Sequence, residues 1–263
     1  NRIFDLHEYS LIKTEHNSVY GLNDQLALLL TTSGSTGSHK LVRISYKNIM
    51  YNAMDVINTF GTKESDVYLA LMPLHYTFGV MWLFIHLYSG ATLILTQKTV
   101  FDEQFWDYIG TKATVFAGVP YIYELMDMMN IYERDITSIR SMTVGGGKLN
   151  DDIYTKYTRY LQKYRKKFIN VYGQTEGTTI LFTNSTDKNH GIGVPVGNNC
   201  AYLEDDNGVI INSDDTDGEL VYKGDNVTLG YAECGNDLIK GDEFGGVLHT
   251  GDIARRDSDG FFY

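Results

Sequence analysis

The sequence predicts an α/β fold: a mainly parallel sheet with flanking helices, followed by a smaller β-rich subdomain. Short apolar runs alternate with amphipathic segments up to about residue 182, and this alternation is typical of parallel sheets covered by helices. After residue 183, glycine, aspartate and asparagine dominate and the apolar runs become short, which indicates an all-β unit. We therefore divide the chain into an α/β subdomain, 1–183, and a β-rich subdomain, 184–263.

Strands are expected where short apolar runs stand between polar or glycine-rich segments. In the first subdomain these runs cover 26–31, 67–71, 91–95, 113–117, 141–144 and 168–172, and in the second 201–204, 209–211 and 219–222.

Helices are expected between the strands of the first subdomain. Ser45 suits the N-cap of a helix whose apolar residues, among them Ala53 and Phe60, recur at helical spacing. Pro120 is tolerated in the first turn of a helix over 119–129. Further helices are expected over 79–88, 101–110 and 151–164.

Composition bounds the class of protein. The chain has 263 residues, of which 43% are hydrophobic, and a net charge of -11, so it can bury a substantial core but is a poor match for nucleic acid. Its longest apolar run, 80–85, is too short for a membrane span. Cys200 and Cys234 form no CxxC pair, which fits a reducing cytoplasmic location.

A segment rich in hydroxyls and glycine, TTSGSTGSHK at 31–40, directly follows the first predicted strand. Glycines let backbone N–H groups approach phosphate oxygens, hydroxyls donate hydrogen bonds, and Lys40 adds positive charge. The spacing excludes a P-loop, because Gly34 and Gly37 are too close and Leu41 follows the lysine. The GxGxxG fingerprint is also absent. On composition alone, a flexible surface loop remains the alternative.

Two more segments favour a nucleotide site. YGQTE at 172–176 follows a predicted strand, at the end where α/β sheets bind ligands. In it Thr175 offers a hydroxyl for a phosphate, Glu176 a carboxylate for magnesium, and Tyr172 a ring for a base. Asp252, in HTGD at 249–252, is suited to accept both hydroxyls of a ribose.

Six segments in this order resemble the motifs of the adenylate-forming (AMP-binding) enzymes, which include acyl-CoA synthetases, aryl-CoA ligases, luciferases and the adenylation domains of peptide synthetases. The family patterns are (S/T)SG(S/T)TGxPKG, PLFHxxG, GGAPL, YGxTE, GEL…GY and TGD…DG. The corresponding segments here are 32–40, 72–79, 145–149, 172–176, 218–220 with 230–231, and 250–252 with 259–260. Each motif alone is weak, but six ordered matches are specific.

The resemblance implies ATP-dependent activation of a small carboxylic acid to an acyl-adenylate with release of pyrophosphate, aided by Mg²⁺. The acyl group then passes to a thiol, of coenzyme A or of phosphopantetheine on an acyl carrier protein. The chemistry is mainly charge neutralisation and positioning. The alternatives are an adenylation domain that loads a carrier protein and a nucleotide-binding module inactive in this form.

The resemblance implies that 1–183 is the ATP- and acyl-binding subdomain, and it also assigns residues to the ATP site. The phosphate loop contributes Thr32, Ser33, Gly34, Ser35, Thr36, Gly37 and Lys40, and the adenine side contributes Gly145, Gly146, Gly147, Tyr172, Gly173 and Gln174. Asp252 is expected to bind the ribose, Thr175 the α-phosphate and Glu176 the magnesium ion. Thr175, Glu176 and Lys40 are the predicted catalytic residues.

The acid pocket is expected to include His75, Tyr76, Phe78 and Val119, although Tyr76 also suits a packed core position. Thr77 stands where amino-acid-activating members carry an aspartate for the substrate ammonium group. A threonine supplies no such charge, so an aryl, fatty or other simple acid is expected.

The chain departs from the family pattern in two ways. His39 and Leu41 replace the proline and glycine of the phosphate loop, and Gly147-Lys148 replaces the Ala-Pro of GGAPL, but no phosphate donor is lost. The chain also starts at Asn1 and stops where the family continues into its hinge. We therefore expect a core piece without the mobile C-terminal domain and its lysine, able to bind adenine nucleotide but weak in adenylation.

Overall fold

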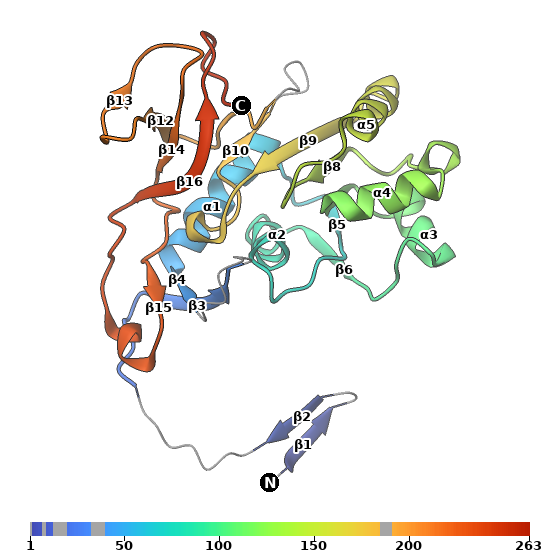
Figure 1. Ribbon diagram of the computed structural model, residues 1–263. Coiled ribbons are helices and arrows are strands. Elements are labelled where there is room, and N and C mark those ends of the chain that lie inside the picture. The colour runs from blue at the N-terminus through green and yellow to red at the C-terminus, as the bar shows by residue number, and fades with distance from the viewer. Residues whose placement is uncertain (1, 7–8, 13–19, 33–39, 185–190) are drawn as a thin grey trace.

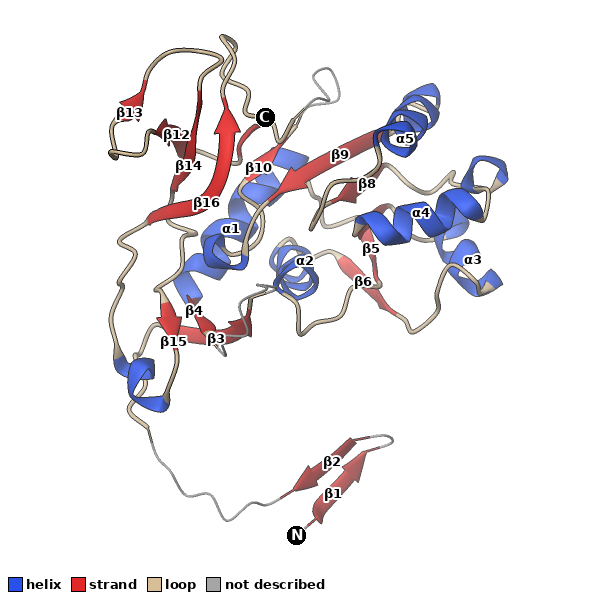
Figure 2. Cartoon of the chain, viewed as in Figure 1, coloured by secondary structure: helices blue, strands red, loops and turns tan. Residues whose placement is uncertain are grey.

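The computed structural model describes residues 2–6, 9–12, 20–32, 40–184 and 191–263. Its central sheet has seven strands in the order β11-β10-β9-β8-β7-β5-β6 (Figures 1 and 2). The strands from β9 to β6 are parallel, and β10 and β11 add antiparallel strands at one edge. The expected α/β fold is confirmed. The strands are β5 (Val67–Ala70), β6 (Thr92–Leu95), β7 (Val115–Gly118), β8 (Ser141–Val144), β9 (Lys167–Tyr172), β10 (Phe182–Thr183) and β11 (Val194–Pro195).

Helices cover both faces of this sheet (Figure 1). Side chains of successive residues in a strand point to opposite faces, so Val115 packs toward α1 and α2 while Phe116 packs toward α3, α4 and α5. Each face thus has its own apolar core. The helices are α1 (Tyr46–Phe60), α2 (Thr77–Tyr88), α3 (Glu103–Thr111), α4 (Pro120–Met128) and α5 (Asp151–Lys163).

The predicted cap of α1 is confirmed. The Ser45 hydroxyl accepts a hydrogen bond from the Asn48 N–H at 3.0 Å, and the Asn48 side chain accepts one from the Ser45 N–H at 2.9 Å. This reciprocal pair satisfies donors that a helix start leaves open. The helix ends at Gly61, whose φ of 65° is left-handed.

The first predicted strand is present but does not join the parallel sheet, contrary to expectation. β3 (Leu26–Thr31) pairs antiparallel with β4 (Leu41–Ser45), and β15 (Tyr231–Ala232) completes a three-stranded sheet. The connection between β3 and β4 is short, and a parallel pair would need a crossover of a dozen or more residues.

A buried arginine holds this small sheet to the later part of the chain. The Arg43 side chain is fully buried and donates to the carbonyl oxygens of Leu229, Tyr231, Lys240 and Gly241. It also pairs with the Glu243 carboxylate at 2.5 Å. A buried guanidinium is tolerated only when its donors are satisfied in this way.

The β-rich part forms an antiparallel sheet in the order β13-β12-β14-β16, as its composition predicts. Its apolar face packs around Leu203, Leu220 and Tyr222. β11 and β15 follow residue 183 in sequence yet pair with strands that precede it, and the division at residue 183 stays a prediction. The strands are β12 (Cys200–Glu204), β13 (Ile210–Ile211), β14 (Asp217–Lys223) and β16 (Val247–Arg255).

The remaining described elements are short. They are a hairpin of β1 (Arg2–Leu6) and β2 (Tyr9–Ile12), and the 3-10 turns η1 (Ile131–Glu133), η2 (Thr175–Gly177) and η3 (Gly235–Ile239). Among the described residues, none of the helices combines the length and apolar character needed to cross a bilayer.

His86 is buried within the core between α2 and the sheet. Its ring stacks on Tyr68, with centroids 4.6 Å apart, and its Nδ1 lies 2.8 Å from the Trp82 carbonyl oxygen. Among the described residues, its Nε2 has no hydrogen-bond partner. Burial disfavours the imidazolium and lowers the pKa of His86 below its ordinary value.

This burial predicts acid sensitivity. Below the ordinary histidine pKa of about 6.5, His86 binds a proton in the unfolded chain but stays neutral in the folded protein. The free energy of unfolding therefore falls as pH falls. The slope contributed by His86 is at most about 1.4 kcal/mol per pH unit and ends below its lowered pKa. Denaturant unfolding between pH 7.5 and 5 should show that slope in the unaltered chain and lose it in His86→Phe. The exposed His75→Phe serves as the control, and a slope unchanged in His86→Phe would contradict the prediction.

Candidate functional site

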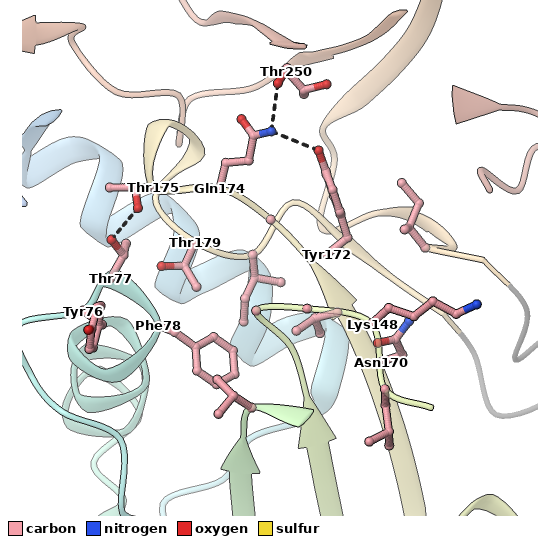
Figure 3. A pocket seen from close by; sticks show the side chains of 18 of the residues that line it. Tyr76, Thr77, Phe78, Lys148, Asn170, Tyr172, Gln174, Thr175, Thr179 and Thr250 are labelled. Atoms are coloured by element: carbon pink, nitrogen blue, oxygen red, sulfur yellow. Dashed lines mark hydrogen bonds between the residues drawn. The ribbon is translucent and has the colours of Figure 1, made fainter. Parts of the chain in front are cut away.

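A cavity of about 1740 Å³ opens at the carboxyl ends of the parallel strands. The turn after β9, the start of α2 and the 145–149 segment contribute lining residues (Figure 3). The first turns of α5 also line the cavity. The wall is completed by Thr31, Thr32 and Lys40 from the β3–β4 hairpin, by Tyr231 from β15 and by Thr250 from β16. This is the edge at which α/β sheets bind ligands.

The turn after β9 folds back tightly upon itself. A Cβ at Gly173 would lie 1.4 Å from the carbonyl oxygen of Thr179, so only glycine fits there. The Gln174 carbonyl oxygen accepts hydrogen bonds from the N–H groups of Gly177 at 3.1 Å and Thr179 at 3.0 Å. Gln174 and Thr175 lie along one wall of the cavity (Figure 3), and Glu176 also lines it.

The start of α2 meets this turn through a pair of hydroxyls. Thr77 Oγ1 donates to Thr175 Oγ1 at 2.9 Å (Figure 3). A Cβ at Gly79 would lie 2.2 Å from the Pro73 carbonyl oxygen, so the absence of a side chain lets α2 pack closely on the preceding segment. Thr77, which the sequence analysis uses to predict the class of acid, also contacts Thr175, the residue predicted to bind the α-phosphate.

A polar network joins the turn to β16. Gln174 Nε2 donates to the Tyr172 hydroxyl at 3.2 Å and to the Thr250 carbonyl oxygen at 2.9 Å (Figure 3). It also donates to Asp252 Oδ2 at 3.1 Å. The Tyr172 hydroxyl donates to the same Asp252 oxygen at 2.5 Å. Burial, reinforced by this bond, raises the pKa of Tyr172 above its ordinary value, so the phenol stays a donor at neutral pH.

A second network surrounds Glu176. The Tyr231 hydroxyl donates to Glu176 Oε1 at 2.8 Å. Lys40 Nζ lies 5.6 Å from the centroid of the Tyr231 ring and 3.1 Å from Glu233. One carboxylate, one tyrosine and one lysine, each from a different segment, therefore meet at the cavity wall.

The three glycines of the 145–149 segment have two different roles: two line the cavity, and one lets the segment pack closely on its neighbours. Gly146 and Gly147 line the cavity. Gly145 is buried behind them, where a Cβ would lie 2.5 Å from Val171 and 3.0 Å from Phe78. Gly145 therefore lets the segment approach β9 and the phenylalanine ring.

Most of the residues predicted for the site come together. Those lining the cavity are Thr32, Lys40, Tyr76, Phe78, Val119, Gly146, Gly147, Tyr172, Gly173, Gln174, Thr175 and Glu176. Asp252 reaches the site through its bonds to Tyr172 and Gln174. Tyr76 is 50% exposed, which excludes the core position. His75 is exposed beside Tyr76 and does not line the cavity. Ser33, Gly34, Ser35, Thr36 and Gly37 lie outside the described residues.

Tyr231 and Thr179 are among the lining residues that the sequence analysis did not assign to the site. The sequence places Tyr231 in the GY motif and gives it no role in the site. That motif is the sequence feature from which a role could have been inferred. Thr179 lines the cavity at 7% exposure with a left-handed φ of 89°, and among the described residues its hydroxyl has no partner (Figure 3). A β-branched residue at positive φ is strained, and periodicity does not reveal it.

The donor set is compatible with a magnesium ion that arrives with phosphates. Within the described part of the chain there is no cluster of three or more histidine, cysteine or acidic residues for a metal. Glu176 stands instead as a single carboxylate beside the Thr175 hydroxyl. Magnesium is commonly held by one or two carboxylates together with substrate phosphates and water, so the residues present fit it.

A parallel sheet with this cavity at its carboxyl edge is the architecture of the adenylate-forming enzymes. The chain belongs to the AMP-binding enzyme family, whose model matches residues 7–232.

Similar proteins are ligases of carboxylic acids and coenzyme A. A 2-succinylbenzoate–CoA ligase of Bacillus cereus is 30% identical over 251 residues, which cover 91% of this chain and 49% of that protein. A long-chain-fatty-acid–CoA ligase of Salmonella typhimurium is 28% identical, covering 90% and 43%. The solved O-succinylbenzoate coenzyme A synthetase of Bacillus subtilis, in complex with AMP, superposes with a TM-score of 0.77 at 25% identity, covering 93% and 50%. The chain spans about half the length of these relatives.

The unpartnered hydroxyl of Thr179 gives a stability prediction. Thr179→Val keeps the branched shape and removes a buried, unsatisfied hydroxyl, so the ligand-free chain should gain about 1 kcal/mol in unfolding free energy. Its neighbour Thr178 is the matched control, since it is also left-handed and buried but donates to the Asn226 carbonyl oxygen at 2.6 Å. Thr178→Val should lose about 1–2 kcal/mol. Denaturant titration measures both, and equal losses in the two variants would contradict the prediction.

Proposed function

We propose that the chain supplies the nucleotide- and acid-binding part of an AMP-forming acid–CoA ligase. Such an enzyme joins a carboxylic acid to the α-phosphate of ATP, releases pyrophosphate, and passes the acyl group to the thiol of coenzyme A. The observation that carries the proposal is the convergence of Lys40, Thr175, Glu176 and the Tyr172–Asp252 pair on one cavity. A lysine, hydroxyl groups and carboxylates from three segments, the β3–β4 hairpin, the turn after β9 and β16, are thus available to one ligand in this cavity.

Each group suits one part of ATP. Asp252, already an acceptor for Tyr172 and Gln174, is assigned to the ribose hydroxyls. Thr175 is assigned to the α-phosphate and Lys40 to the β- and γ-phosphates. Glu176 would hold a magnesium ion, which when bound neutralises phosphate charge and so eases attack by an anionic acid.

The acid is proposed to be aryl, fatty or otherwise without an α-ammonium group. Thr77 offers no carboxylate and its hydroxyl is donated to Thr175, while Phe78, Val119 and Ile180 give the cavity an apolar wall. The relatives named above act on 2-succinylbenzoate and long-chain fatty acids. Phosphopantetheine on a carrier protein, which presents the same thiol, is the alternative acceptor. Cys200 and Cys234 are exposed and unpaired, which suits the proposed cytoplasmic location.

A nucleotide comparison tests the proposal. The chain should bind ATP more tightly than 2′,3′-dideoxy-ATP in calorimetry, by about tenfold or more, because hydrogen bonds to a charged acceptor contribute about 1.5–3 kcal/mol. Asp252→Asn should lose most of this preference. Asp225→Asn, which alters a surface carboxylate paired with Lys47, should keep it. No ATP binding, or equal affinity of the unaltered chain for the two nucleotides, would contradict the proposal.

A further inference from the structure

We infer that Tyr231 is a positioning residue of the nucleotide site. It orients the Glu176 carboxylate for the magnesium ion that accompanies ATP, and it gives Lys40 an aromatic face at the same wall. The inference rests on the proposed function, and it assigns a task to a residue that the sequence motif left without one.

The first support is the hydrogen bond to Glu176. The Tyr231 hydroxyl donates to Oε1 at 2.8 Å, and among the described residues Oε2 receives no hydrogen bond. The main chain of Glu176 is held separately, because its carbonyl oxygen accepts from the Thr228 N–H at 2.9 Å. One oxygen is thus fixed, while no side chain or main-chain donor of the described residues binds the other, which we assign to the cation. Groups that orient a metal ligand in this way typically contribute a factor of about 10–100 in metal affinity.

The second support is the rigidity of Tyr231 itself. It lies on β15, 55 residues from Glu176 in sequence, and pairs with Val42 of β4. Arg43 Nε donates to its carbonyl oxygen at 3.0 Å, and the Phe244 ring packs edge-on at 5.5 Å. Both the main chain and the ring of Tyr231 are therefore held in place, so its hydroxyl has few alternative positions. A residue that orients another side chain requires this rigidity.

The third support is the arrangement of charge around the ring. Lys40 Nζ lies 5.6 Å from the Tyr231 centroid, within the range of a cation–π contact. Its ion pair with Glu233 involves side chains 44% and 64% exposed, and such exposed pairs are weak. Lys40 can therefore exchange Glu233 for an anionic ligand while it stays close to the ring. Tyr231 thus links the proposed magnesium ligand to the proposed phosphate ligand.

The test separates orientation of the carboxylate from general support of the fold. Calorimetry gives the dissociation constant of ATP with excess Mg²⁺ and with EDTA, and the ratio of the two measures the coupling between metal and nucleotide. Tyr231→Phe removes only the hydroxyl and should reduce that ratio by about tenfold, while ATP binding in EDTA stays unchanged. Tyr231→Leu also removes the ring and should weaken ATP binding in EDTA by about two- to fivefold.

Tyr222→Phe is the matched control. Tyr222 is a buried tyrosine whose hydroxyl donates to Asn226 Oδ1 at 3.1 Å, and Asn226 in turn donates to the Gly177 carbonyl oxygen at 3.0 Å. Tyr222 therefore supports the same turn without touching the Glu176 carboxylate. Removal of the Tyr222 hydroxyl should lower the melting temperature of the chain but leave the coupling between Mg²⁺ and ATP unchanged.

Three results would overturn the inference. A coupling ratio unchanged in Tyr231→Phe, or reduced equally in Tyr222→Phe, would leave Tyr231 as a structural residue while the proposed function stands. A failure of the unaltered chain to bind ATP would overturn the proposed function and this inference with it.

Discussion

The site depends on the close approach of Gly173 to the Thr179 carbonyl oxygen, where a Cβ would lie 1.4 Å away. This contact closes the turn after β9 so tightly that Thr178 and Thr179 both take left-handed backbone conformations. Strain of this kind persists only where surrounding contacts maintain it. Here they include the hydrogen bonds to the Gln174 carbonyl oxygen and the bond from Leu181 N–H to the Tyr172 carbonyl oxygen at 2.9 Å. The result is a rigid turn that directs consecutive polar side chains toward one cavity.

Each of these side chains then meets a group from a distant segment. Thr175 receives the hydroxyl of Thr77 from α2, Gln174 reaches β16, and Glu176 receives the hydroxyl of Tyr231 from β15. Three parts of the chain therefore position one five-residue motif. Buried Arg43, which holds the strands around Tyr231, extends this support to the β3–β4 hairpin that carries Lys40. Preorganisation of this kind lowers the reorganisation needed when charge develops on a bound ligand.

The sequence predicted the parallel sheet and its helices because apolar periodicity there is strong, and cap chemistry at Ser45 marked the start of α1. It missed β4, since Arg43 interrupts the apolar run of Leu41–Ser45 and its burial follows only from carbonyl partners nearly 200 residues away. Ordered motifs located most of the cavity residues. They gave no role to Tyr231 or Thr179. Tyr231 acts through a contact between β15 and the turn after β9, 55 residues away in sequence, and Thr179 through backbone strain, and neither leaves a local pattern. His75, predicted for the acid pocket from its neighbours in the motif, is exposed and does not line the cavity.

We propose that the turn after β9 and its distant partners form one MgATP site. A crystal structure of the chain with ATP and magnesium would test this proposal. We expect the ribose against Asp252, the α-phosphate beside Thr175 and the metal on Glu176 Oε2, with the Tyr231 hydroxyl still bonded to Oε1. Nucleotide bound away from this turn, or a metal ion without contact to Glu176, would contradict it.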